Sequence, residues 1–383
     1  MDIVFVSNYY NHHQKEVAET LNSLSHNCFY FIETEPISEE RRQLGWGEDN
    51  KPSYVLEYQS DKKRCDDLIL ASDVLICGGT SDEFFSERLK TGKLVFRYEE
   101  RFFKDGLKAT LRPSFWKMII KCHGAYQGKP VYMLCANGYL PRELAALHLY
   151  KEKKLRWGYF PEFIKYDSYA LLDSKECQMK KNKRIEIVWC GRFIWWKHPE
   201  LVVDVAKYLK NNGIHIHINM IGDGPLLQAI QRQIEAEKLQ SEVTLTGAIQ
   251  HDLVRKEMEK ASIFLGTSGR EEGWGAVLNE AMNSCCVAVV NAKMGAAPFL
   301  IEHGKNGFVY HKREQLLKTM KEICIQLEEN AQSELLRSIA NHAYSTIQTT
   351  WNGTEAATRL YHFIQCTKEG KCLEKGKGPG SLI

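Results

Sequence analysis

The sequence has no long apolar run, no CxxC pair of cysteines and no large excess of charge. No apolar stretch approaches the roughly 18 to 20 residues of a membrane span, and the first residues, MDIVFVS, lack the form of a secretory signal peptide. The twelve cysteines are scattered without the CxxC spacing of a zinc site, and the net charge of +3 is small for a dedicated nucleic-acid binder. We therefore expect a cytoplasmic protein with reduced thiols, no metal site and no nucleic-acid partner.

Two short motifs of nucleotide-binding enzymes are also missing. GDGPLL at residues 222–227 has two glycines of the dinucleotide-binding pattern GxGxxG and lacks the third, which argues against an NAD-dependent dehydrogenase. The sequence contains no Asp-x-Asp, a spacing often used to hold a metal ion on a nucleotide sugar. The charge of any bound diphosphate must then be met by basic side chains and helix N-termini.

What the sequence does contain is an alternation of short β-rich runs and helical patterns in both halves. Such alternation is typical of parallel sheets covered by helices, and 383 residues exceed the ~250 to 300 at which a single core stops growing. The sequence therefore predicts two α/β domains in series. The expected strands are 3–6, 29–32, 74–77, 94–98 and 131–135 in the first half, and 185–190, 215–221, 243–245, 263–266, 287–290 and 308–310 in the second.

The stretch KYDSYALLDSKECQMKKNKR is polar and weakly periodic, so it indicates a domain boundary near residues 165–182. The chain is expected to be helical from Tyr310 to about Cys366, and its Gly/Lys-rich end has too little apolar content to fold. The expected parts are an N-terminal domain at 1–165, a C-terminal domain at 166–345, a last helix at 346–366 and a flexible tail at 367–383.

Basic and glycine-rich residues follow two expected strands of the second domain, at the edge where ligands of open α/β sheets bind. GRFIWWKHPE carries Arg192 and Lys197, and TSGREEGWGAVLNEAM places Gly273 and Gly275 around Trp274 directly before a helix. These elements can converge on a diphosphate, because glycine permits close backbone approach and the cations neutralise phosphate charge. A nucleotide diphosphate is the expected ligand.

Two carboxylates accompany this segment. Glu272 precedes the glycines, and Glu280 stands about a turn and a half into the helix. Either could accept hydrogen bonds from vicinal hydroxyls of a ribose or a sugar. The simpler alternatives are a capping group and a helix-face carboxylate for the two acids, and ordinary surface cations for Arg192 and Lys197.

The succession VWCGRFIWWKH, MIGDGPL, VTLTGAI, SGREEGWGAVLNEAM and GAAPFLIEHGKNGFVY resembles the C-terminal donor domain of the GT-B retaining glycosyltransferases of family 4, the glycosyl transferases group 1. The blocks stand in the family's order over about residues 185–310, and the Glu-x7-Glu spacing of Glu272 and Glu280 is specific in that context. The resemblance implies an α/β GT-B fold: two Rossmann-like doubly wound domains face a central cleft, and the last helix crosses back to the first domain.

The resemblance also implies roles for single residues. Arg192 and Lys197 would bind the diphosphate and stabilise it as leaving group, and Glu272 would contact hydroxyls of the transferred sugar; these three would form the catalytic set. Glu280 would hold the ribose. Further donor-binding positions would be Gly191, Ala248, Ile249, Gly273, Trp274, Gly275, Ala276 and Val277.

The implied activity is transfer of a sugar from a nucleotide-diphosphate sugar to a saccharide or lipid-linked acceptor, with retention of configuration and with no metal or other cofactor. Bacterial polysaccharide or glycolipid biosynthesis is the expected setting. Two other functions stay open: a non-hydrolysing nucleotide-sugar epimerase of the same fold, and a catalytically silent nucleotide-sugar-binding protein. These motifs do not specify the base, the sugar or the acceptor.

The first half resembles the family only in organisation. In place of a glycine-rich loop after the first strand stand Asn8 to His13. Many family members have a histidine after the strand that begins LVFRYEERFF, and here Glu99 and Glu100 stand instead. Adjacent residues on a helix point about 100° apart, which disfavours a chelating histidine pair, and Asn11 with Gln14 is typical of a helix start. The segment is either a helix start or part of the cleft wall. The acceptor-side candidates are Asn8, His12, His13 and Glu99.

Residues 101–121, RFFKDGLKATLRPSFWKMIIK, interleave basic and aromatic side chains. Such a segment could lie on an anionic membrane and admit a lipid-linked acceptor, which would place the protein at the inner face of the cell membrane. A helix with a basic solvated face explains the same pattern.

Overall fold

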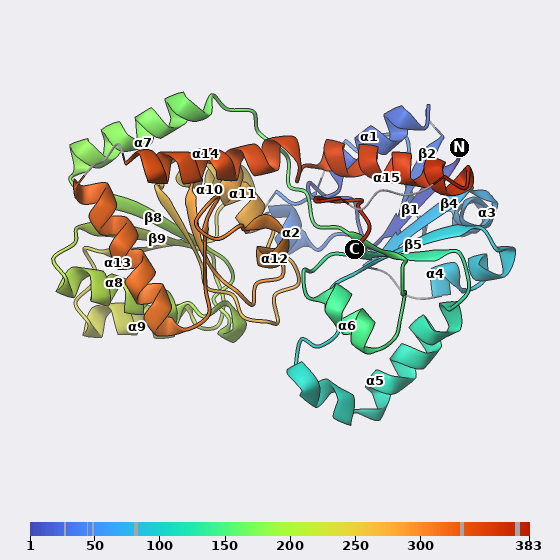
Figure 1. Cartoon of the computed structure of the whole chain (residues 1–383), viewed down its shortest axis with the longest axis horizontal. Coiled ribbons are helices and arrows are strands. Elements are labelled where there is room, and N and C mark those ends of the chain that lie inside the picture. The colour runs from blue at the N-terminus through green and yellow to red at the C-terminus, as the bar shows by residue number, and fades with distance from the viewer. Residues whose placement is uncertain (27, 44, 48–49, 80–82, 330–332, 372–375) are drawn as a thin grey trace. The chain divides into compact units, whose positions relative to one another are not determined.

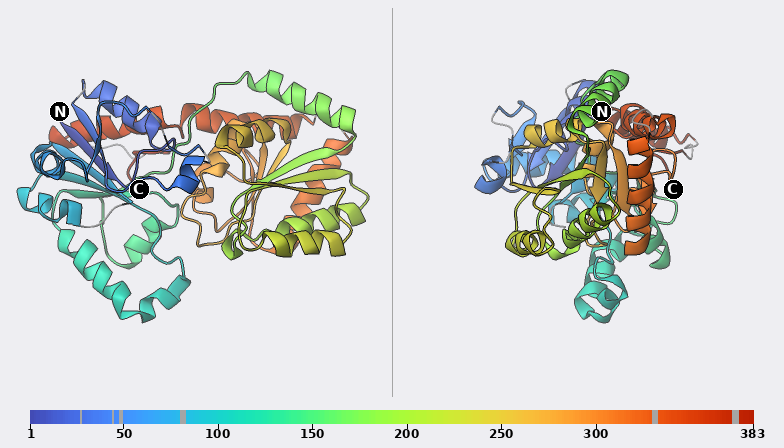
Figure 2. Two further views of the ribbon diagram at one scale, coloured as in Figure 1. Left: turned by 180° about the vertical axis from the view of Figure 1, so that it is seen from behind. Right: turned by 90° about the vertical axis from the view of Figure 1, so that its left-hand side faces the viewer.

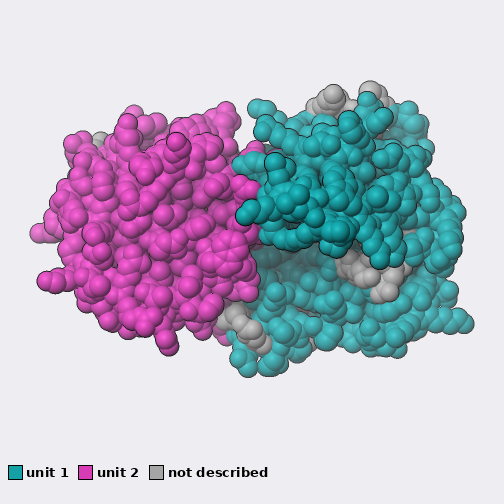
Figure 3. Space-filling view, turned by 90° about the horizontal axis from the view of Figure 1, so that it is seen from below, with its two compact units in different colours: residues 1–162, 350–383 teal, residues 163–349 magenta. Residues whose placement is uncertain are grey.

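The computed structural model describes residues 1–383 except 27, 44, 48–49, 80–82, 330–332 and 372–375 (Figure 1). The chain forms two compact units, coloured separately in Figure 3: unit 1 is Met1–Glu162 with Thr350–Ile383, and unit 2 is Phe163–Thr349. The expected domain ends, 165 and 345, lie close to the two junctions. In the described part of the chain, no helix combines the length and the apolar content needed to cross a membrane.

Unit 1 is built on a seven-stranded parallel sheet of order β3-β2-β1-β4-β5-β6-β7. The order changes direction between β1 and β4, where every strand residue is buried. This is a doubly wound sheet with its switch point at those two strands. The strands are β1 (Ile3–Ser7), β2 (Phe29–Glu33), β3 (Val55–Glu57), β4 (Val74–Gly78), β5 (Leu94–Glu99), β6 (Val131–Cys135) and β7 (Lys154–Arg156).

The helices of unit 1 cover this sheet, and most are short (Figure 1). Short 3₁₀ and π segments connect several of them. The helices are α1 (Lys15–Leu24), α2 (Glu39–Gln43), α3 (Lys62–Ala71), α4 (Glu83–Ser86), α5 (Pro113–Met118), α6 (Leu140–Ala146) and α15 (Gly353–Lys368), and the short segments are η1 (Arg88–Thr91), η2 (Gly106–Leu111), η3 (Ile119–His123) and η4 (Gly124–Tyr126).

The last helix, α15, packs on α1 within unit 1. Its first turn is held by Glu16 of α1, whose carboxylate accepts hydrogen bonds from the backbone of Gly353 and Thr354 and from the Thr354 hydroxyl. A carboxylate at this end of a helix also interacts favourably with the helix dipole. A single helix was expected at 346–366. In the structure, α14 (Glu334–Thr349) ends within that range and α15 begins at Gly353, and the chain passes from unit 2 to unit 1 between these two helices.

The end of the chain is not a flexible tail where the structure describes it. Leu382 forms an antiparallel bridge with Leu155 of β7, and Arg156 exchanges backbone hydrogen bonds with Ser381 and Gly380. The Arg156 guanidinium also donates to the carbonyls of Gly376 and Leu382. The prediction from apolar content was wrong because an edge strand offers unpaired backbone groups, and these hold the segment.

Unit 2 contains a six-stranded parallel sheet of order β10-β9-β8-β11-β12-β13. Its switch point lies between β8 and β11, the strands whose following loops carry the predicted site. The strands are β8 (Ile185–Cys190), β9 (Ile216–Ile221), β10 (Val243–Gly247), β11 (Ile263–Gly266), β12 (Val287–Asn291) and β13 (Phe308–Tyr310), all within two residues of the expected bounds.

A helix, α7 (Ser168–Asn182), occupies the stretch that was expected to be an irregular boundary. Asp167 caps it by accepting from the backbone of Tyr169 and Ala170. Its buried face includes Lys175, whose ammonium donates to the carbonyls of Met258, Ala261 and Ser284. The helical pattern was missed because polar residues occupy buried positions of this helix. The other helices of unit 2 are α8 (Glu200–Asn211), α9 (Leu227–Ala236), α10 (His251–Lys260), α11 (Val277–Asn283), α12 (Ala297–Leu300), α13 (Arg313–Glu329) and α14, with one short turn at η5 (Trp195–Lys197).

Candidate functional site

The loops after β8 and β9 come into close contact at the carboxyl edge of the unit 2 sheet. Gly222 and Gly224 have φ angles of +136° and +150°, and a Cβ on Gly222 would overlap the carbonyl oxygen of Gly191. A Cβ on Gly224 would lie 2.7 Å from the carbonyl oxygen of Phe193. The two glycines of GDGPLL are therefore required by the packing of these loops, which explains the pattern without a dinucleotide.

Lys197 and Glu272, which the sequence places 75 residues apart, form an ion pair in the structure. Each side chain is 14% exposed, so both are near the surface and partly shielded from water. Lys197 ends the turn η5 after β8, and Glu272 lies in the loop between β11 and α11. The fold thus brings together two of the three predicted catalytic residues.

The loops that carry this ion pair are fixed to each other by further hydrogen bonds. The Thr267 hydroxyl donates to the Lys197 carbonyl and accepts from the Trp189 indole at 2.8 Å. The backbone N–H of Gly269 donates to the Trp196 carbonyl at 2.6 Å. The position of Lys197 relative to Glu272 is therefore set by the backbone, which limits how far either side chain must reorganise to meet a ligand.

Arg192, the third predicted catalytic residue, is exposed in the loop after β8. Its guanidinium lies 5.9 Å from the ring centroid of Trp196, and it forms no ion pair within the described part of the chain. Gly191, directly before it, is half-buried beside Lys197. Arg192 is thus a cation available to an anion at the same edge of the sheet.

The glycine loop before α11 is tightly packed. Gly273 is buried, Gly275 has a φ of +89°, and a Cβ on Gly275 would overlap the Met294 side chain. Trp274 is 1% exposed, and its indole donates to Asn279 at 2.8 Å. The Trp274 ring therefore belongs to the core, and a ligand has access only to the backbone of this segment. Ala276 and Val277, both half-buried, stand at the start of the helix, where backbone N–H groups lack helical partners.

Glu280, one turn into α11, is half-buried. Burial raises the pKa of its carboxyl, and the nearby Arg255 cation opposes this shift. Sequence reasoning missed Arg255, because nothing in the polar run of α10 marks it as buried. Its guanidinium donates to Asn283, which in turn accepts from and donates to the backbone of Ile164.

Ala248 and Ile249 follow β10 at the same carboxyl edge, two strands away from β8. Ala248 is exposed and Ile249 is half-buried. A ligand as long as a nucleotide could reach from the loop after β10 to the loop after β8 that carries Lys197, because only β9 lies between these two strands.

In unit 1, the segment with the two histidines lies before the first helix and not on it. α1 begins at Lys15, and Asn11 stabilises the preceding turn by accepting from the His13 backbone at 2.9 Å. The rings of His12 and His13 are 4.0 Å apart, and each lies 5.3 Å from the Trp46 ring. The argument from helical spacing therefore does not apply to this pair.

The other acceptor-side candidates of unit 1 also lie at strand ends. Asn8 follows β1, and its carboxamide oxygen accepts from the Tyr9 backbone at 2.9 Å. Glu99 ends β5 and forms an ion pair of 2.8 Å with the buried Arg97. The Glu99 carboxylate thus already has a structural role.

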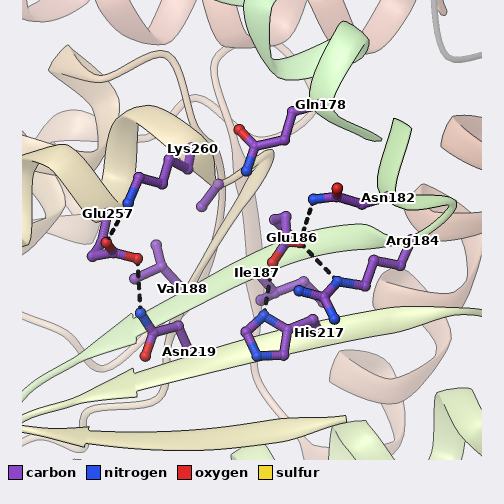
Figure 4. A pocket seen from close by; sticks show the side chains of 11 residues that line it. Gln178, Asn182, Arg184, Glu186, Ile187, Val188, His217, Asn219, Glu257 and Lys260 are labelled. Carbon is purple, nitrogen blue, oxygen red and sulfur yellow. Dashed lines mark hydrogen bonds and ion pairs between the residues drawn. The ribbon is translucent and has the colours of Figure 1, made fainter. Parts of the chain in front are cut away.

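A polar hollow of about 180 Å³ lies on the sheet of unit 2, nearer the amino ends of β8 and β9 (Figure 4). Its lining groups are satisfied by one another: Glu186 contacts His217 at 2.7 Å and Arg184 at 2.9 Å, and Asn219 donates to Glu257 at 3.0 Å. We regard this hollow as structural, because it is away from the carboxyl edge and its charges are paired within the protein.

Comparison with known families and curated proteins points to the same region of the chain. Residues 173–345 match the family model described as Glycosyl transferases group 1. A 2-deoxystreptamine N-acetyl-D-glucosaminyltransferase of Niallia circulans is 28% identical over 123 residues, 32% of this chain and 31% of that protein. The gpi3 subunit of the phosphatidylinositol N-acetylglucosaminyltransferase of Schizosaccharomyces pombe is 26% identical over 164 residues, 43% of this chain and 36% of that protein. The similarity thus spans about a third of these relatives.

Solved structures resemble the whole chain. Anabaena Alr3699/HepE in complex with UDP has a TM-score of 0.68 at 13% identity, covering 95% of this chain and 100% of that one. WaaG, a glycosyltransferase involved in lipopolysaccharide biosynthesis, has a TM-score of 0.60 at 15% identity, covering 93% of this chain and 98% of that one. The chain, with its seven-stranded and six-stranded parallel sheets, therefore has the same fold as these proteins.

Proposed function

The chain belongs to the group 1 glycosyltransferases of the GT-B fold, and we propose that it transfers a sugar from a nucleotide-diphosphate sugar to a saccharide or lipid-linked acceptor. In this proposal the transfer retains the anomeric configuration and needs no metal ion. The observation that carries the proposal is the ion pair of Lys197 and Glu272 at the carboxyl edge of unit 2, in loops that also supply Arg192 and a tight glycine turn.

The pair offers the two kinds of group that a nucleotide sugar needs. In the free protein each side chain satisfies the other. When the donor binds, the Lys197 ammonium would turn to the diphosphate together with Arg192, and the Glu272 carboxylate would accept hydrogen bonds from sugar hydroxyls. Cations held in place by the backbone stabilise the negative charge that develops on a departing diphosphate, and such fixed charges contribute strongly to catalysis.

The nucleoside end of the donor would lie along the remaining predicted positions. Glu280 would accept from the ribose hydroxyls, and Ala248 and Ile249 would flank the base. The raised pKa of Glu280 fits a carboxyl that is shielded from water, to which a ribose hydroxyl could donate.

We further propose UDP-N-acetylglucosamine as the donor. Two relatives are named as N-acetylglucosaminyltransferases, and the structurally similar HepE has been solved with UDP and with UDP-glucose. UDP-glucose is the second candidate.

Binding can be tested by thermal shift with UDP, GDP, ADP and their sugars. UDP should raise the melting temperature of the protein, because a ligand at about 100 times its Kd adds about 2.7 kcal/mol to the free energy of unfolding. Lys197→Met should weaken UDP binding by about tenfold or more, since it removes a charge-assisted contact. Lys207→Met is the matched control, because Lys207 forms a surface ion pair with Glu237 on the same unit. An equal UDP shift in both variants would contradict the role of Lys197.

Catalysis is tested separately with Glu272→Gln, which should keep the UDP shift and lower transfer or donor hydrolysis by about a hundredfold. Interconversion of the nucleotide sugar without an acceptor would instead favour the epimerase. Binding of UDP sugars with no turnover in any acceptor screen would favour the silent binding protein.

A further inference from the structure

The segment from Lys104 to Lys121 in unit 1 exposes apolar side chains to an extent that the rest of the described chain does not. Four of the nine large hydrophobic residues that are exposed among the described residues lie within residues 107–120. Their exposed fractions are 79% for Leu107, 82% for Leu111, 42% for Trp116 and 67% for Ile120.

These side chains lie on the outer side of the segment, because its inner side is occupied by core residues. Ala109, Phe115 and Ile119 are buried in the unit 1 core, and the Phe115 ring stacks on Phe103 at 5.4 Å. The segment, η2 to η3 with α5 between them, stands out from the rest of unit 1, as the blue-green ribbon at the bottom of both views in Figure 2 shows. The segment is therefore anchored in the unit 1 core through one face and exposes its other face to solvent.

The charge of the segment is mostly positive. Five cations alternate with the exposed apolar residues, and Asp105 is the single acid between residues 104 and 121. Asp105 is paired with Arg112, and Lys104 with Glu100. The other three, Lys108, Lys117 and Lys121, form no ion pair within the described part of the chain.

We propose that this outer face, Leu107, Lys108, Leu111, Trp116, Lys117, Ile120 and Lys121, docks on a membrane surface that contains anionic phospholipids. A solvated helix face would carry the cations without four exposed apolar side chains, and a purely apolar protein interface would not need three unpaired lysines. A membrane interface satisfies both, because the apolar side chains enter the headgroup region while the ammonium groups remain beside the lipid phosphates.

The Trp116 ring fits the same location. Its indole N–H donates to the Thr110 carbonyl at 2.8 Å, so the ring is held with its polar atom satisfied and part of its surface exposed. Tryptophan is favoured at membrane interfaces. This inference rests on the proposed function and adds that the enzyme meets its acceptor at the lipid surface.

Co-sedimentation of the full-length protein with vesicles tests the proposal. The protein should bind vesicles of phosphatidylcholine with about one third phosphatidylglycerol at least about tenfold more tightly than pure phosphatidylcholine, and added salt should reduce the difference. Combined replacement of the three lysines should weaken binding to the anionic vesicles by about tenfold or more. The replacements are Lys108→Gln, Lys117→Gln and Lys121→Gln.

Two further sets of variants distinguish insertion of apolar side chains into the lipid from electrostatic attraction alone. Replacing exposed apolar residues of the face, Leu107→Ser, Leu111→Ser and Ile120→Ser, should reduce binding to the anionic vesicles by about tenfold or more. The matched controls on unit 2, Leu253→Ser with Leu335→Ser, should leave binding unchanged. Brominated lipids should quench the fluorescence of the protein, and Trp116→Phe should remove most of this quenching.

Several outcomes would overturn the proposal. These are failure of the wild type to bind anionic vesicles at low salt, binding that is unchanged in the triple variants, or a dimer that the Leu→Ser and Ile→Ser changes dissociate without any vesicle binding. The thermal shift with UDP is an independent readout. Vesicle binding that persists when UDP gives no shift would refute the proposed donor and leave the membrane surface standing.

Discussion

At the residue scale, His123 illustrates how burial determines the charge of a side chain. The ring is 2% exposed, and its Nδ1 lies 3.3 Å from a guanidinium nitrogen of Arg97 and 3.2 Å from the Tyr150 hydroxyl. Burial, assisted by the Arg97 charge, lowers the pKa of His123 from 6.5 to about 3. The folded protein therefore holds this histidine neutral, whereas the unfolded chain protonates it below about pH 6.5.

This difference predicts a dependence of stability on pH. Because the unfolded state binds the extra proton, the contribution of His123 is fully present above pH 6.5 and is lost as the pH falls toward 3, by about 1.4 kcal/mol per pH unit. His123→Gln should reduce the loss of the free energy of unfolding between neutral and acidic pH, measured by urea unfolding. His215→Gln is the control, since the His215 side chain is 81% exposed. Equal pH slopes in the wild type and His123→Gln would contradict the assignment.

At the element scale, the short edge strands show what sequence patterns miss. β3 and β7 are three residues long, and neither was expected, because three residues are too few to display an alternation. β7 is stabilised by its neighbour β6 on one side and by residues 380–383 on the other. The end of the chain thus shields the backbone of an edge strand.

Deleting residues 376–383 should destabilise unit 1. The deletion removes three backbone hydrogen bonds to β7 and three from the Arg156 guanidinium, which together contribute a few kcal/mol at about 0.5 to 1.5 kcal/mol each. The midpoint of urea unfolding should fall, while binding of UDP at low urea stays unchanged. Arg156→Met in the full chain should give part of the same loss, and an unchanged midpoint after deletion would show that the segment contributes nothing.

At the scale of the whole molecule, each unit has its own sheet and core, and the predicted donor residues all lie in unit 2. Sequence reasoning found the strands of unit 2 and the loops that follow them, because short β-rich runs and glycines mark them. It did not find the ion pair of Lys197 with Glu272, because the pairing depends on two loops that meet only when β8 and β11 are neighbours in the sheet.

Because the predicted donor residues all lie in unit 2, UDP should protect a specific set of backbone amides from hydrogen exchange. Saturating UDP should slow exchange in the loop 191–197 and around residues 269–280, since both contribute to the predicted site. The α5 segment of unit 1, which is distant from these loops in the chain, should exchange equally fast with and without UDP. Protection of unit 1 strands with no change in the two loops would place the nucleotide elsewhere.

The sequence by itself determined the two α/β sheets, the resemblance of about residues 185–310 to the glycosyl transferases group 1 and the positions of the predicted donor loops, because period, glycine spacing and residue type are local properties of the chain. Only the tertiary structure decided which of those residues meet. The burial of Trp274, the pairing of Lys197 with Glu272, the docking of the chain end on β7 and the exposed apolar face around α5 each depend on contacts between segments far apart in the chain. Such contacts produce no periodic pattern in the sequence, because which segments meet depends on how the other elements pack.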